Sequence, residues 1–148
     1  MRLSVLDQSP VRKGGTAKEA LQETVVLAQL ADRLGFTRFW VSEHHNTALL
    51  AGTTPEILMT HLAGQTKNIR IGSGGVMLPH YSALKVAENF RMMETLFPGR
   101  IDLGVGRAPG GDRITAAVLN PGNNFSEEDF VRQLFDLQNY LNDQFEPG

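Results

Sequence analysis

Short apolar segments alternate along the chain with longer stretches in which apolar residues recur every three or four positions. The apolar segments are rich in β-branched and aromatic side chains and predict strands at residues 3–6, 38–41, 69–73 and 101–105. The periodic stretches predict helices at residues 16–34, 54–66, 82–96 and 126–141, with only a weak helical pattern between 113 and 125. Parallel strands need such crossover helices, so the pattern indicates an α/β fold.

Capping signals place the helix boundaries. Thr16 with Glu19, and Ser126 with Asp129, have the spacing of a capping box, so helices should begin at both positions. Gly35 follows the first periodic stretch and is expected to end that helix in the left-handed conformation.

The glycine pattern argues against a dinucleotide-binding sheet. Such a sheet carries its glycine fingerprint after the first strand, where this chain has no glycine over residues 7–10. The later Gly104 and Gly106 are followed by Pro109 at the position where a third glycine would stand.

Polar or glycine-rich segments instead follow all four predicted strands. In a (β/α)₈ barrel the strand-to-helix loops all open onto one catalytic face, so this distribution favours a barrel. A complete barrel takes about 250 residues. The sequence therefore predicts a single domain over residues 1–148 that forms the N-terminal half of a barrel, completed by a partner or re-packed.

Composition narrows the function classes. A net charge of −2 without basic runs argues against nucleic acid or an anionic membrane as the main partner. The chain has no cysteine, which excludes disulfides and thiolate catalysis. Without a signal peptide or an apolar run long enough to cross a bilayer, a cytoplasmic protein is expected.

The segment of Glu43, His44 and His45 is the strongest candidate for chemistry. A histidine at a barrel mouth can donate a hydrogen bond or move a proton near neutral pH, so His44 is a catalytic candidate. The alternative is a histidine–Glu43 pair that only orders the loop. Adjacent histidines on extended backbone point in opposite directions, so no metal site is expected.

Two further loops carry candidate ligand contacts. The glycine-rich stretch after the third strand, including Ser73, Gly74 and Gly75, would let backbone approach a flat ligand, or would form a bulge. Arg107 could bind a phosphate or carboxylate, or pair with a nearby aspartate such as Asp112 or Asp102. The remaining candidates for contact with a substrate are Gln8, Glu43, His45 and His80.

Four ordered motifs resemble the bacterial-luciferase-like flavin monooxygenases: residues 6–10, 39–45, 72–81 and 98–110. The resemblance implies a (β/α)₈ barrel that binds reduced FMN at its C-terminal face. There oxygen adds to the flavin, and the resulting C4a-peroxide oxidises an aldehyde or a similar small organic substrate. Flavin reductase is an implied partner, and helices of this half are expected to form a homodimer.

The resemblance also carries roles to particular residues. His44 matches the active-site histidine, and the backbone of residues 73–75 matches the strand end that lies against the flavin ring, with a non-prolyl cis peptide at Gly74–Gly75. Arg107 matches an arginine that approaches the FMN phosphate. Gly106 stands where luciferase has a reactive cysteine, so light emission does not follow.

Three alternatives stay open at this point. The chain could be a flavin-binding protein without catalysis or a truncated remnant that associates with itself. It could also belong to an enzyme that uses the deazaflavin F420.

Overall fold

The computed structural model describes residues 1–123 and 125–144 of the chain. Its strands are β1 (Ser4–Asp7), β2 (Arg38–Val41), β3 (Arg70–Ser73), β4 (Val76–Met77), β5 (Ile101–Asp102) and β6 (Val105–Gly106). Its helices are α1 (Ala17–Arg33), α2 (Pro55–Gln65), α3 (Ala83–Leu96), α4 (Arg113–Leu119) and α5 (Glu127–Leu141), with a 3₁₀ turn at Leu78–His80.

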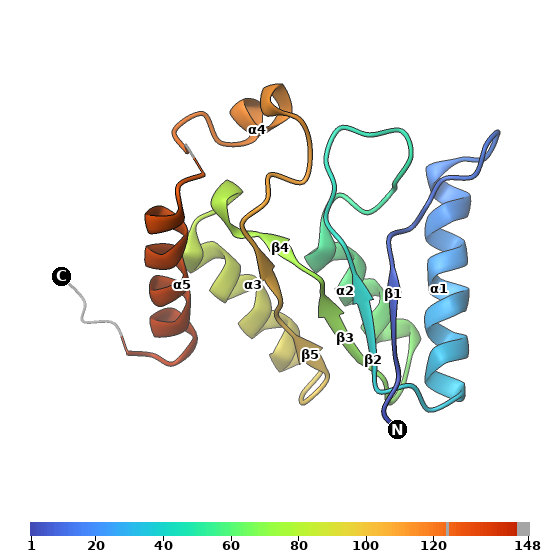
Figure 1. The fold of residues 1–148 in the computed structure, drawn as a ribbon. Coiled ribbons are helices and arrows are strands. Elements are labelled where there is room, and N and C mark those ends of the chain that lie inside the picture. Colours follow the sequence, from blue (N-terminus) through green and yellow to red (C-terminus); the bar gives the residue numbers. More distant parts are fainter. Residues whose placement is uncertain (124, 145–148) are drawn as a thin grey trace.

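The central feature is a four-stranded sheet in the order β1–β2–β3–β5, with every neighbouring pair parallel. Consecutive strands are joined through the helices, and this arrangement confirms the α/β class with repeated strand–helix units. In Figure 1, α2 and α3 lie behind the sheet and α1 lies beside β1, whereas no helix covers the front. The sheet therefore has one covered face and one open face.

Side-chain alternation along the strands explains which face is covered. Phe39, Val41 and Ile71 are at most 1% exposed and point towards the helices, where they meet Met59 and Leu62 of α2. The residues between them on each strand point to the other face, because successive side chains of a strand alternate. Burial of the first set forms the core and holds the helices against the sheet.

Helix starts agree closely with the capping signals. The capping box of Thr16 and Glu19 is formed in both directions, and the Ser126 hydroxyl accepts from the backbone N–H of Asp129. Gly35 has a φ of 74°, as expected for a residue after a helix end. At α2, Pro55 occupies the first turn, but the Thr54 side chain makes no capping hydrogen bond.

The apolar periodicity predicts a buried face of α3 with Val86, Phe90 and Met93, and all three are buried. In α1 the periodicity predicts Leu21, Val25, Ala28 and Ala31, and the buried face is rotated away from the first two. Ala20, Thr24, Ala28 and Ala31 are the buried residues of α1, and Leu21 is only half-buried. The cause is a tertiary contact, because the Thr24 hydroxyl donates to the Asp7 carboxylate at 2.5 Å.

The predicted fourth strand at 101–105 is wrong as one continuous element. It is divided into β5 and β6, and β6 pairs with the short β4. The division follows from close backbone packing at Gly104, where an added Cβ would lie 2.3 Å from the Ser73 carbonyl oxygen. The Ser73 hydroxyl also donates to the Gly104 carbonyl at 2.8 Å and accepts from the Gly104 N–H at 3.0 Å.

No helix in residues 1–123 or 125–144 combines the length and apolar character needed to cross a membrane.

The close packing at Gly104 makes a test of the fold. We expect Gly104→Ala to lower the free energy of unfolding by about 1–3 kcal/mol, since the new methyl group overlaps backbone rather than a movable side chain. Gly64→Ala is the matched control: its Cβ would lie 3.9 Å from the Phe97 ring, and alanine favours a helix by up to about 1 kcal/mol. Urea unfolding followed by circular dichroism measures both, and equal midpoints would contradict the packing argument.

Candidate functional site

The loops that follow the four parallel strands are joined to one another at one end of the sheet. The first and second loops meet in an antiparallel bridge between Pro10 and Leu50. The second and fourth loops are connected by a hydrogen bond from the His45 N–H to the Gly110 carbonyl at 2.9 Å. The loops that carry the predicted polar residues therefore form one connected cluster at the carboxyl ends of the strands, as at the catalytic face of a barrel.

Glu43 is the buried centre of this loop cluster. Its side chain is fully buried, and its carboxylate interacts with three groups: the His45 ring Nε2 at 2.6 Å, the Tyr81 hydroxyl at 2.6 Å and the Met77 backbone N–H at 2.9 Å. A buried carboxylate requires such partners, because an unpaired one would be strongly destabilising. Glu43 thus connects the second loop with the exit of β3, and its placement favours a positioning role over direct contact with a substrate.

His44 lies on the same loop but is partly exposed. Its Nδ1 lies 3.2 Å from the Ser42 hydroxyl, and its backbone N–H donates to the Gly52 carbonyl at 3.0 Å. The ring is therefore held from one side. Its Nε2 has no hydrogen-bond partner among the residues that the structure describes, so this atom can exchange a proton or a hydrogen bond with a bound molecule.

His45 and His80 form an aromatic contact in the interior of the loop cluster. Their ring centroids are 5.4 Å apart in an edge-to-face arrangement, and His80 is 7% exposed. His80 Nε2 lies 2.7 Å from the Pro109 carbonyl and acts as the donor there, which connects the third and fourth loops. With His45 engaged by Glu43, both imidazoles stabilise loops, and their predicted contact with a substrate stays a prediction.

The glycine-rich exit of β3 lies directly beside the histidine loop. The Gly74 N–H donates to the Val41 carbonyl at 2.7 Å, so the chain leaves β3 beside the end of β2, where the loop with His44 begins. The Gly74–Gly75 peptide bond is cis, which confirms the expectation from the resemblance. Gly74 is exposed, and no side chain of its own covers the backbone.

Arg107 follows β6 and is half-exposed. Within residues 1–123 and 125–144 its one polar contact is an ion pair with Glu127 at 3.5 Å, and the Glu127 side chain is 79% exposed. The alternative pairing with Asp112 or Asp102 is wrong, because Asp112 caps α4 through the Thr115 N–H at 2.7 Å and Asp102 pairs with other arginines. A long, solvated ion pair contributes little, so Arg107 is available to an anion.

Gln8 is exposed at the end of β1. Gln8 lies between Asp7 and Ser9, whose backbone N–H donates to the Asp7 carboxylate at 3.2 Å. Ser9 has a φ of 50°, so the chain turns directly after Gln8. Gln8 thus lies on the same end of the sheet as His44, and a contact with a substrate stays a prediction for it as well.

Sequence reasoning missed the role of Tyr81. The residue was visible only as part of a motif after the third strand, yet its hydroxyl is one of the three groups on Glu43. Burial, and then the hydrogen bond to the Glu43 carboxylate, raise the pKa of Tyr81 well above its ordinary value. Tyr81 therefore stays a neutral donor and helps to hold the carboxylate in place.

Asn120 and Asn123 were also missed. Each side-chain amide donates to the Pro79 carbonyl at 2.8 Å, which holds the segment after α4 against the β3 exit loop. Asn120, Pro121 and Gly122 are residue types typical of a turn, but sequence alone does not indicate the partner of Asn120, which lies 41 residues earlier in the chain.

A parallel α/β sheet with connected polar loops at one end is the arrangement of half a (β/α)₈ barrel. The chain belongs to the luciferase-like monooxygenase family, whose pattern it matches over residues 1–128.

Two curated relatives in Bacillus subtilis match nearly the whole chain. The protein YwcH is 60% identical over 95% of this chain, and an N-acetyl-S-alkylcysteine monooxygenase is 49% identical over 98% of it. The match covers 42% and 43% of these relatives, so the chain spans less than half of their length.

Solved structures give the same result. The crystal structure of apo-MsnO8 superposes with a TM-score of 0.95 at 47% identity, covering 99% of this chain and 45% of that one. The oxygenating constituent of 3,6-diketocamphane monooxygenase from Pseudomonas putida, in complex with FMN, has a TM-score of 0.77 at 27% identity and covers 93% and 38%.

The contacts of Tyr81 lead to a pH-dependent prediction. Because its folded pKa is raised, its contribution to stability is complete below the ordinary tyrosine value of about 10 and is lost progressively as pH rises above it. In the wild-type protein we expect no phenolate from Tyr81 near about pH 10, whereas Glu43→Gln should lower its pKa by removing the facing negative charge.

Ultraviolet absorbance of phenolate against pH, compared with Tyr81→Phe, measures this effect. If Tyr81→Phe removes a titration step near about pH 10 from the wild-type curve, the proposed contact with Glu43 is not formed.

Proposed function

We propose that the chain forms the N-terminal half of a flavin-dependent monooxygenase and supplies one side of an FMN site at the carboxyl ends of its strands. The observation that carries this proposal is that the loop with the partly exposed His44 and the bare backbone of Gly74 and Gly75 both start at neighbouring strand ends, those of β2 and β3. Family membership supports the class of reaction, and a relative whose structure contains FMN supports the choice of cofactor.

The residues on this surface suit FMN chemically. Glycine backbone without side chains can lie against a flat ring system, and the Arg107 guanidinium can pair with a phosphate. Reduced flavin, when bound, supplies the activation of oxygen. The protein contributes position, a proton-exchanging group and exclusion of water.

His44 is the residue we assign to proton exchange. Ser42 holds its Nδ1, which leaves Nε2 directed to hydrogen bonding with a bound molecule or with an oxygen-derived anion. Glu43 and His45, the two residues that flank His44 in the sequence, form a buried pair. This pair limits the movement of the backbone that carries His44. An acid or base that is pre-positioned in this way needs no rearrangement during the reaction.

The substrate is assigned only by class. An aldehyde or another small organic molecule fits the resemblance, and a relative named as an N-acetyl-S-alkylcysteine monooxygenase broadens this class to organic sulfur compounds. Full activity requires the rest of the barrel, since the chain spans less than half of its relatives.

Cofactor binding tests the assignment of Arg107. We expect the chain to quench FMN fluorescence saturably, near one flavin per chain, and Arg107→Gln to weaken FMN binding about tenfold while leaving riboflavin binding unchanged. Arg113→Gln, an exposed arginine at the start of α4, is the control. Absence of FMN binding would contradict the proposed site, and tighter binding of F420 would favour a deazaflavin enzyme instead.

A second experiment tests His44. In an assay with reduced FMN, oxygen and an aldehyde, on the chain supplied with the remaining barrel segment of a relative, we expect His44→Gln to lower turnover about 100-fold or more with flavin binding unchanged. His61→Gln changes an exposed histidine of α2 and should have no effect. Equal loss of turnover in both variants, or none in His44→Gln, would remove the assigned role.

A further inference from the structure

The face of the sheet that no helix covers, which we call the open face, is unusual for a parallel sheet. All-parallel sheets are normally buried on both sides. Here Leu6 is 60% exposed, and Trp40 lies beside it over Gly72, whose missing side chain makes room for the indole ring. An apolar patch of this kind on a parallel sheet indicates that another polypeptide covers it.

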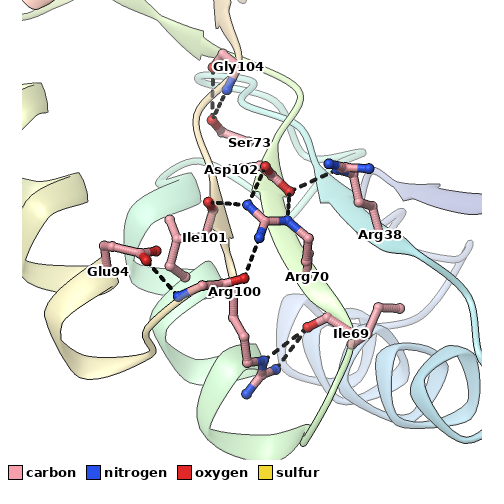
Figure 2. A network of polar contacts seen from close by, with 10 residues as sticks. Arg38, Ile69, Arg70, Ser73, Glu94, Arg100, Ile101, Asp102 and Gly104 are labelled. Carbon is pink, nitrogen blue, oxygen red and sulfur yellow. Dashed lines mark hydrogen bonds and ion pairs between the residues drawn. The ribbon is translucent and has the colours of Figure 1, made fainter. Parts of the chain in front are cut away.

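Near the amino-terminal ends of the strands, the open face carries a charged cluster of Arg38, Arg70 and Asp102 (Figure 2). Asp102 accepts from Arg70 Nε at 2.8 Å and from its terminal nitrogen at 2.6 Å, and also from Arg38 Nε at 2.9 Å. These contacts, led by the hydrogen bond from Arg70, hold the pKa of Asp102 below its usual range.

The two arginines are not equivalent. Arg70 also donates to the Ile101 carbonyl at 2.9 Å and to the Gly99 carbonyl, so both of its terminal nitrogens are engaged. Arg38 uses only Nε, and its two terminal nitrogens have no partner within residues 1–123 and 125–144. The Arg38 side chain is still 35% exposed, so water can solvate it as long as the face stays open.

Covering the open face would remove this water. The cluster contains two arginines and one aspartate and thus has a net charge of +1. A guanidinium that loses its water without gaining an acceptor is strongly destabilising. The covering polypeptide must therefore bring an acceptor to Arg38, and a carboxylate both neutralises the charge and matches the paired N–H groups of the guanidinium.

The same charge argues against a second copy of this chain as the cover. A symmetric pair of open faces would bring two clusters of charge +1 towards each other, and like charges facing across an interface are unfavourable. The relatives suggest a different occupant, because the match covers only 42% and 43% of their lengths and more than half of each lies outside it.

In a complete luciferase-like barrel the remaining strand–helix units cover the open face. We propose that this segment places a carboxylate against Arg38. The inference rests on one part of the proposed function, namely that the chain is one half of a barrel. It adds the chemistry by which the two halves recognise each other, at the end of the sheet opposite to the candidate site.

The test uses the full chain and, as a probe, the part of the YwcH relative that lies outside the match, expressed as a separate polypeptide. Isothermal titration calorimetry and sedimentation should show a one-to-one complex. We expect Arg38→Gln to weaken it at least tenfold, Arg38→Lys to weaken it less, and Arg33→Gln, an exposed residue at the end of α1, to leave it unchanged. High salt should weaken the wild-type complex more than the Arg38→Gln complex.

Three results would overturn the inference: equal binding by Arg38→Gln, absence of a complex with the probe, or a stable dimer of the chain alone that excludes the probe. Circular dichroism of each variant checks that the fold is retained. FMN binding is read separately, so a complex that forms without binding FMN contradicts the proposed function and leaves the docking surface in place.

Discussion

The candidate site depends on one buried negative charge. The Glu43 carboxylate is fully buried and is balanced by an imidazole, a phenol and a backbone N–H that come from two different loops. Removing any one of these groups would leave an acceptor deep in the protein without its partner. The arrangement of His45, Met77 and Tyr81 is thus fixed by the requirement that Glu43 be satisfied, and the loop that carries His44 is fixed with them.

The periodic part of the fold could be predicted from the sequence, whereas its tertiary adjustments could not. Helix starts at Thr16 and Ser126 depend on residues three positions apart, so local sequence contains the information. The division of the fourth strand depends on contact between Ser73 and Gly104, which are 31 positions apart. The rotated stripe of α1 likewise reflects a contact of Thr24 with a residue in another element.

The same distinction holds for the site. The location of the candidate site was predictable, because histidine, arginine and glycine occur at strand ends, where a barrel places its active-site loops. A pairing of histidine with Glu43 was one open alternative, and the structure assigns that pairing to His45. The contact of Tyr81 with Glu43 and the pairing of Arg107 with Glu127 could not be predicted, since each joins elements that only the fold brings together.

Trp40 is the only tryptophan in the chain, and it stands on the open face above Gly72. Indole emission responds strongly to the polarity of its surroundings, and no second indole contributes to the signal. Closure of the barrel would transfer this one chromophore from a wet surface to a dry interior. The protein therefore contains its own optical indicator of whether its two halves have come together.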